Sequence, residues 1–257
     1  MQNPEHKGSF RKVLVRVPNW VGDAVISLGF LEALKRHFVP DELVVLAHRR
    51  VKSIFPANDN VISFSSDREL FEISLKLRGR KFGLGFALPM SFASGFSLFL
   101  AGVKRRVGFK REGRGVFLTD SLRLPEGYKK NEHLLRTFFR LLEHVGYEGD
   151  VVKPRLTFSE SDLKEARKII KERDLKEDRT VAIAPFASFG PSKEWGLERY
   201  SELVNGLLLR GYSPLILGAS WERKRSAPLC SNPRVQCILG GYPLRIIASI
   251  LKLVRVT

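Results

Sequence analysis

Short runs of aliphatic residues alternate with segments of helical periodicity along the whole 257-residue chain. Between positions 24 and 38, Leu28, Leu31 and Leu34 recur at the spacing of one helix face. The predicted strands of the first half are residues 12–17, 43–47, 61–64 and 82–86. Strands that alternate with helices in this way predict an α/β fold, with a parallel, doubly wound sheet covered by helices on both faces.

The second half repeats this order after a candidate linker. A helix is predicted over residues 131–145, and residues 150–160, which include Pro154, are the best candidate for an interdomain linker. Beyond it, strands are predicted over residues 181–184, 213–217 and 235–239, and helices over residues 160–173, 196–210, 221–229 and 243–253. We therefore predict two Rossmann-like domains, residues 1–150 and 151–257. The second is predicted to be incomplete, because doubly wound sheets usually have more than three strands.

The formal net charge is +17, from 44 Lys and Arg against 27 Asp and Glu. Such a charge attracts phosphate-rich partners, which include nucleic acids, anionic lipid headgroups and nucleotide-linked substrates. The densest basic groups are residues 104–106, 110–111 and 223–225, and the other cations are spread along the chain. No aromatic-rich nucleic-acid signature accompanies them, so a solvated basic surface is favoured over a specific nucleic-acid site.

Two further features bear on the compartment. Cys230 and Cys237 have neither a CxxC spacing nor a nearby histidine, which favours two reduced thiols over zinc or a disulfide framework. The first twelve residues lack the apolar core of a signal peptide. The apolar stretch 82–103 is interrupted by Pro89 and glycines, which predicts a buried strand followed by an apolar helix rather than a membrane span.

A first candidate site follows the first predicted strand, in the segment Arg-Val-Pro-Asn-Trp-Val-Gly-Asp of residues 16–23. Ligands of open α/β sheets bind at this carboxyl edge. Gly22 allows close backbone approach, and a carboxylate at Asp23, stabilised by the helix dipole, can accept a proton from an attacking hydroxyl. The alternative, that Asp23 only caps the helix, is slightly favoured by the pattern alone.

A second candidate site occupies the equivalent turn of the second half, residues 185–195. The hydroxyl of Ser188, the loop glycine Gly190, the cation of Lys193 and a following helix N-terminus together suit a phosphate group. The Walker spacing is absent. The alternative is an ordinary turn with an N-cap at Ser192 and a solvated Lys193, and the two interpretations are equally supported.

Together these two segments resemble glycosyltransferase family nine, the ADP-heptose:lipopolysaccharide heptosyltransferases, and the PNWVGD string resembles their type II members most. The resemblance extends to residues 218–222 and 240–244, and so covers nearly the whole chain. It implies a GT-B architecture and metal-free, cofactor-independent, inverting transfer of heptose from ADP-heptose. It also implies Asp23 as catalytic base, Ser188 and Lys193 on the donor diphosphate, and Glu222 near the donor ribose.

The implied acceptor is the lipopolysaccharide inner core, a lipid A–Kdo–heptose molecule, which implies a cytoplasmic protein peripheral to the inner membrane. The family has a further NDSGxxH-type loop after the helix that corresponds to residues 243–253, and this sequence has no such string. We therefore expect a truncated donor domain with an unpaired sheet edge. A non-catalytic remnant or acceptor-binding module is the alternative function.

Overall fold

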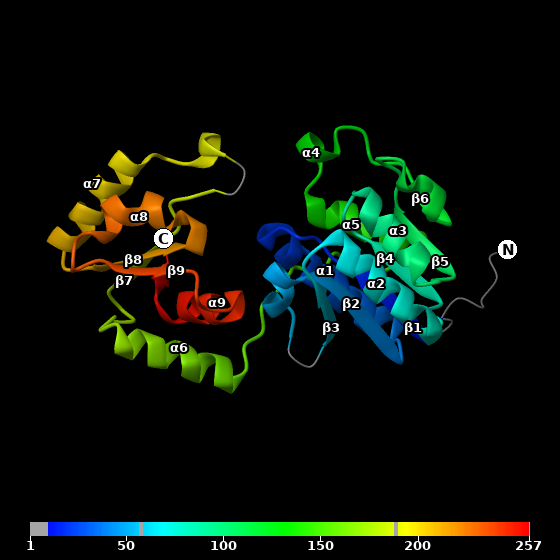
Figure 1. Ribbon diagram of the computed structural model, residues 1–257, viewed down its shortest axis with the longest axis horizontal. Coiled ribbons are helices and arrows are strands. Elements are labelled where there is room, and N and C mark those ends of the chain that lie inside the picture. The colour runs from blue at the N-terminus through cyan, green and yellow to red at the C-terminus, as the bar shows by residue number, and fades with distance from the viewer. Residues whose placement is uncertain (1–9, 57–58, 188–189, 257) are drawn as a thin grey trace. The chain divides into compact units, whose positions relative to one another are not determined.

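The computed structural model describes residues 10–56, 59–187 and 190–256. The chain forms two compact units, Met1–Thr157 and Phe158–Thr257 (Figure 1). Each unit is an α/β layer structure built on its own parallel sheet. The α/β, doubly wound class predicted from the sequence is therefore confirmed.

Unit 1 contains a six-stranded sheet in the order β3-β2-β1-β4-β5-β6, in which every pairing is parallel. Its strands are β1 (Lys12–Arg16), β2 (Glu42–His48), β3 (Asn60–Phe64), β4 (Leu84–Ala87), β5 (Arg105–Phe109) and β6 (Asp120–Leu122). Strand order reverses between β1 and β4. That reversal places the principal ligand crevice of a doubly wound sheet at the carboxyl ends of these two strands.

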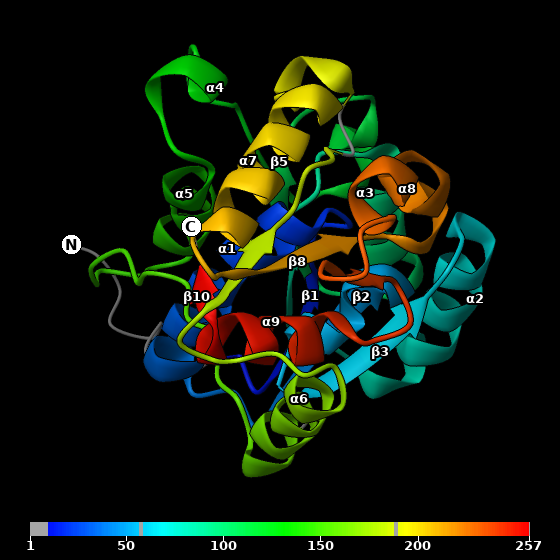
Figure 2. The same cartoon turned by 90° about the vertical axis from the view of Figure 1, so that its left-hand side faces the viewer.

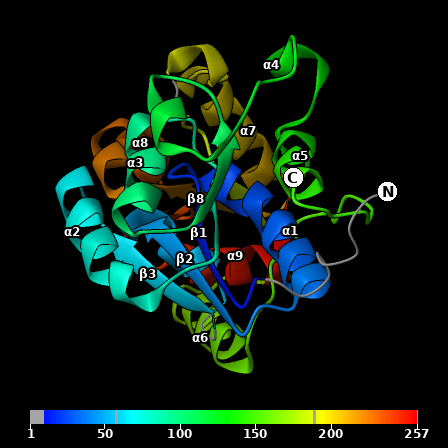
Figure 3. The same cartoon turned by 90° about the vertical axis from the view of Figure 1, so that its right-hand side faces the viewer.

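Helices cover both faces of this sheet (Figure 3). They are α1 (Val21–Phe38), α2 (Asp67–Leu77), α3 (Phe92–Leu100), the single turn α4 (Tyr128–Asn131) and α5 (Leu134–His144). Helices α1 and α5 pack together on one face, and α2 and α3 on the other. Under α2 and α3 the core contains Leu14, Leu46, Phe64 and Leu98, all at most 1% exposed.

Unit 2 contains a four-stranded parallel sheet in the order β10-β7-β8-β9. Its strands are β7 (Thr180–Ile183), β8 (Ser213–Gly218), β9 (Gln236–Leu239) and β10 (Arg255–Val256). Its helices are α6 (Glu160–Glu172), α7 (Leu197–Leu209), α8 (Arg223–Cys230) and α9 (Leu244–Leu253). Helices α6 and α9 pack together on one face of the sheet, and α7 and α8 on the other (Figure 2).

Two sequence-based expectations about unit 2 are wrong. The sheet has four strands rather than three, because the two residues of β10 pair with β7 although they are too few to show a periodic pattern. Cys230 and Cys237 form a disulfide with a Cα–Cα distance of 6.2 Å instead of two thiols. The reason is that α8 ends and β9 begins on either side of one tight turn, which brings the two positions together.

The apolar stretch from residue 82 to 103 forms β4 and α3, as predicted. Strand β4 is completely buried in the centre of the sheet. Throughout the described ranges, every helix is too short or too polar to cross a membrane.

Candidate functional site

The two motif segments occupy equivalent positions in their own sheets. The first follows β1, next to the point in unit 1 where strand order reverses, and the second follows β7, next to the reversal between β7 and β10 in unit 2. Loops at such reversals diverge to opposite faces of the sheet and leave a crevice between them. Each unit thus has such a position at the carboxyl edge of its own sheet, and a predicted site residue follows the strand there.

The turn after β1 presents Asp23 in the first turn of α1. The N-cap is Trp20, which has no side-chain capping hydrogen bond, so the alternative that Asp23 is the cap is wrong. The Asp23 carboxylate is half-buried, and within the described ranges no hydrogen bond or ion pair reaches it. Burial raises the pKa of Asp23 above its usual value. Beside it, a Cβ atom at Gly22 would meet nothing within 4 Å, so the space over this turn is open.

A buried arginine fixes the same turn. The Arg16 side chain is 2% exposed and lies over the ring of Phe64 at 4.5 Å. Its Nη1 donates to the Val17 carbonyl, and its Nη2 donates to Asn19 Oδ1 at 2.7 Å. Burial lowers its pKa to about 9, so the guanidinium is still charged at neutral pH. Its role is not evident from the motif, although a cation within a buried β-branched run is a recognisable signal.

The adjacent strand end adds further cations. His48 closes β2 and is followed by Arg49 and Arg50 in the 3-10 helix η2 (Arg49–Ile54). Its Nδ1 accepts from the Arg50 amide at 3.1 Å, and its Nε2 lies 3.2 Å from the Ser65 carbonyl. Desolvation and the neighbouring arginines lower the pKa of His48, so the ring is neutral and its Nε2–H donates to Ser65. This edge of unit 1 therefore favours an anionic ligand.

The loop after β7 places Gly190 and Lys193 close together. Gly190 has φ +102°, a conformation that glycine adopts without strain, and Lys193 is an exposed residue of the 3-10 helix η5 (Pro191–Lys193). The N-cap of α7 is Gly196, so the alternative cap at Ser192 is wrong. Ser188 lies outside the described residues.

Glu194 holds this loop in position. Its Oε1 accepts from the Ala187 amide at 3.1 Å, and its Oε2 pairs with Arg225 Nη2 at 2.5 Å. Arg225 also lies over the ring of Phe186 at 4.6 Å. The hydrogen bonds from Arg225 and from the Ala187 amide lower the pKa of Glu194. This one carboxylate therefore joins Ala187 and Glu194, which precede Gly190 and follow Lys193, to α8.

Glu222 lies in the turn that follows the neighbouring strand β8. The residue is 8% exposed, and its Oε2 accepts from the Ala219 amide at 2.7 Å. Glycines surround it: a Cβ at Gly218 would lie 3.0 Å from the Glu222 carboxylate, and one at Gly240 would lie 3.0 Å from the Ser220 amide. The turns after β8 and β9 therefore pack closely, and Glu222 shapes the edge that also contains Lys193.

All three tryptophans lie in strand-to-helix turns of this kind and are exposed: Trp20 after β1, Trp195 after β7 and Trp221 after β8. Each tryptophan belongs to a motif segment, but the motifs alone predict no role for them. Large exposed aromatic side chains at the carboxyl edges of sheets are surfaces on which a sugar or a base can pack.

Comparison with known proteins identifies the class. The family model described as "Glycosyltransferase family 9 (heptosyltransferase)" matches residues 70–252. The chain belongs to this glycosyltransferase family.

Particular relatives are heptosyltransferases of type 2. The chain is 26% identical over 220 residues to lipooligosaccharide heptosyltransferase 2 of Haemophilus influenzae, an alignment that covers 81% of this chain and 64% of that protein. It is 26% identical over 228 residues to lipopolysaccharide heptosyltransferase 2 of Escherichia coli K12, covering 83% and 65%. The solved structure of E. coli ADP-heptose lps heptosyltransferase II superposes with a TM-score of 0.78 at 22% identity, covering 95% of this chain and 78% of that one. The fold is thus GT-B-like, and the chain spans about two thirds of the length of its curated relatives.

Proposed function

We propose that this chain transfers heptose from ADP-heptose, with inversion, to the lipopolysaccharide inner core. The family membership and the names of the relatives support the reaction. The observation in the chain itself that carries the proposal is a half-buried carboxylate without a described partner, at the β1 end where strand order reverses. We assign unit 1 to the acceptor, a lipid A–Kdo–heptose molecule, and unit 2 to the nucleotide donor.

In this proposal Asp23 is the general base. Its carboxylate accepts the proton of the acceptor hydroxyl while the hydroxyl oxygen bonds to the anomeric carbon of heptose. The bond from that carbon to the donor phosphate breaks on the opposite face, and ADP leaves with the electron pair. Because burial raises the pKa of Asp23, the base is stronger than an ordinary carboxylate, and transfer falls as pH drops through that raised pKa.

The donor side is assigned to unit 2. Lys193 neutralises the charge that develops on the departing diphosphate, and Gly190 lets the backbone approach it. Ser188 is assigned to the same diphosphate on the resemblance alone. Glu222 is assigned to the donor ribose, for which its Oε1 is the free acceptor, since no described residue donates to that atom.

We further propose that the protein works as a peripheral protein at the cytoplasmic face of the inner membrane. The acceptor is lipid-linked, and the net charge of +17 favours a surface of anionic headgroups. A specific nucleic-acid partner is not proposed.

The test is transfer from ADP-heptose to a purified core acceptor, comparing the wild-type chain with Asp23→Asn. We expect the rate to fall at least a hundredfold, because the amide cannot accept the proton. Glu32→Gln in the same helix is the matched control, since Glu32 forms only an exposed pair with Arg36 at 2.6 Å. If Asp23→Asn is as active as wild type, Asp23 is not the general base.

Calorimetric titration with ADP tests the donor side separately. Lys193→Gln is expected to weaken ADP binding about tenfold, because one charge-assisted contact is lost. A chain that binds ADP in this manner but transfers no heptose would be a binding module, and the transferase proposal would be wrong.

A further inference from the structure

Helix α3 exposes two phenylalanine side chains while it buries two serines. Surface helices normally bury their apolar side chains and expose their polar ones. In α3 the buried positions are Ser94, Gly95, Ser97 and Leu98, whereas Phe92 and Phe99 are 47% and 48% exposed. The buried hydroxyls are satisfied locally, since Ser94 donates to the Ser91 carbonyl at 2.6 Å and Ser97 to the Ser94 carbonyl at 2.9 Å. The helix thus contains serines, but they are buried, and phenylalanines occupy its exposed positions.

These phenylalanines belong to a larger cluster, which we call the aromatic patch. It combines residues of α2, of α3 and of the 3-10 helix η4 (Arg114–Phe117): Phe71, Leu75, Phe92, Phe96, Phe99, Val116 and Phe117. Successive ring centroids lie 5.0 to 6.3 Å apart. Leu75 is 50% exposed and Val116 is 80% exposed. Helices α2 and α3 lie side by side on this face of the sheet (Figure 3).

A buried arginine supports the patch from below. Arg114 is fully buried; its Nε donates to the Phe109 carbonyl at 2.7 Å and its Nη1 to Ser94 Oγ at 2.7 Å. Gly95 makes this approach possible, because a Cβ there would lie 3.2 Å from the Arg114 Cβ. The exposed rings are therefore mounted on packed secondary structure rather than on a loose loop.

Cations surround the patch. Arg106 lies over the Phe99 ring at 5.8 Å. Arg78 packs at the end of α3, where a Cβ at Gly102 would meet its side chain at 3.0 Å, and Lys110 packs beside η4, 3.3 Å from the corresponding position at Gly115. The nearby carboxylates have cationic partners: Glu72 pairs with Arg68 at 3.0 Å and Glu112 lies 3.8 Å from Arg111.

We propose that the aromatic patch is a docking surface for an anionic lipid bilayer. Phenylalanine rings enter the boundary between headgroups and acyl chains, and the exposed Arg78 and Lys110 side chains pair with lipid phosphates. Arg106 instead donates to the Phe117 and Val103 carbonyls. A second copy of the chain is a poorer occupant, because pairing two identical patches would bring the same cations face to face. This proposal rests on the proposed function in one respect: a lipid-linked acceptor requires the protein to bind at a membrane surface.

The experiment is flotation of the full chain with vesicles of phosphatidylcholine containing phosphatidylglycerol. The variant Phe92→Ser/Phe99→Ser is expected to bind at least tenfold more weakly than wild type. Lys110→Gln is expected to bind the vesicles severalfold more weakly than wild type. Raised salt should also weaken the binding of the wild-type chain. Leu209→Ser is the matched control, because Leu209 is an apolar side chain 87% exposed in α7 of unit 2 and belongs to no element of the patch.

Three outcomes would overturn the proposal. They are unchanged vesicle binding by the double variant, an equal loss in Leu209→Ser, and equal binding to vesicles without anionic lipid. Sedimentation would show whether the variant loses self-association instead, which would assign the patch to a second copy. Asp23→Asn is expected to bind vesicles like wild type, so failure of the transferase proposal and failure of this one are distinguishable.

Val116→Ser, at the most exposed patch residue, tests the same surface should the double variant misfold.

Discussion

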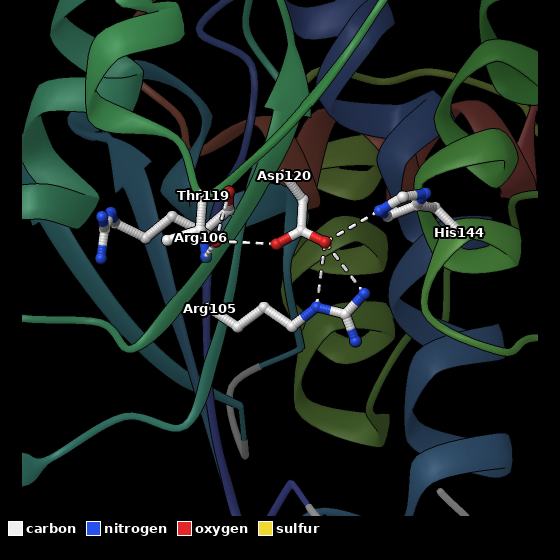
Figure 4. A network of polar contacts seen from close by, with 5 residues as sticks. All are labelled: Arg105, Arg106, Thr119, Asp120 and His144. Carbon is white, nitrogen blue, oxygen red and sulfur yellow. Dashed lines mark hydrogen bonds and ion pairs between the residues drawn. The ribbon is translucent and has the colours of Figure 1, made fainter. Parts of the chain in front are cut away.

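At the scale of single residues, the Asp120 carboxylate shows how charge is used inside unit 1 (Figure 4). It accepts from Arg105 Nη2 of β5 at 2.9 Å and from Thr119 Oγ1 at 2.7 Å, and His144 Nε2 of α5 lies 2.8 Å away. Burial alone would raise the pKa of Asp120, but these hydrogen bonds outweigh it and hold the pKa at about 2. One side chain thus joins the edge of the sheet to a helix.

This network predicts an acid-dependent stability. Because the folded pKa of Asp120 lies below its unfolded value of about 3.9, the stabilisation is fully present above that value and is lost as pH falls towards 2. Asp120→Asn should lower the free energy of unfolding by about 1–3 kcal/mol at pH 7. In urea titrations, the difference between the free energies of unfolding of wild type and variant should be smaller at pH 3 than at pH 7. The control is Asp41→Asn, which removes an exposed pair with Arg11 and should lower the free energy of unfolding by less than about 1 kcal/mol. A difference between Asp120→Asn and wild type that stays the same at pH 7 and pH 3 would contradict the prediction.

Some residues of the candidate site could be predicted from the sequence, and others could not. Asp23 and Gly22 could be placed at a sheet edge because a strand, a turn and a helix start follow one another in the sequence. The burial of Arg114 could not be predicted, since charged residues are normally expected on the surface and no buried apolar run surrounds it in the sequence. The burial of Arg114 depends on an acceptor that the fold brings close from a distant segment, the Pro89 carbonyl, which lies 25 residues earlier in the chain. The Cys230–Cys237 disulfide was missed for a similar reason, because it depends on a turn geometry that spacing does not reveal.

At the scale of elements, Gly29 sets how closely α1 packs against the segment that follows α5. A Cβ at this position would lie 2.1 Å from the Val152 carbonyl oxygen. Glycine to alanine in a helix usually stabilises by about 0.5–1 kcal/mol. Here we expect the opposite sign, a loss of about 1–3 kcal/mol, because a backbone atom must move.

The measurement is urea unfolding of Gly29→Ala, with Gly79→Ala as the control. A Cβ at Gly79 would meet nothing within 4 Å, so that variant should be neutral or slightly more stable than wild type. Stabilisation by Gly29→Ala would show that the segment at residue 152 is not packed on α1.

Strands β1 to β4 and helix α1 were predicted from the sequence, because a run of apolar residues or an apolar helix face marks each of them. Strand β5 begins with two arginines and contains Gly108, and β6 has only three residues, two of them polar. Both become strands because a neighbouring strand offers its backbone for pairing, with β5 between β4 and β6 and β6 at the edge of the sheet, which a local pattern cannot show. Helix α2 was overlooked in the same way, although Ser66 caps it by accepting from the Glu69 amide at 3.3 Å.

At the scale of the whole molecule, the chain consists of two units with separate cores. The buried clusters of unit 1 and of unit 2 share no residue, and those of unit 2 lie on the two faces of its smaller sheet. A perturbation within one core should therefore register mainly in that unit. The disulfide of unit 2 provides a chemical means to test this.

Cys230 and Cys237, with Arg173 and Arg223, are among the residues that line a pocket of about 530 Å³, and we expect a small reductant to reach the disulfide from this pocket. Reduction releases the closed loop between α8 and β9, and the loop-entropy model assigns it a loss of about 2 kcal/mol. Hydrogen exchange with and without reductant should therefore quicken in β8, α8 and β9 and stay unchanged in β1 and β2. The Cys230→Ser/Cys237→Ser variant should exchange like the reduced protein under both conditions. Faster exchange in β1 and β2 on reduction would show that the two cores are coupled, and unchanged exchange throughout would show that the disulfide does not stabilise unit 2.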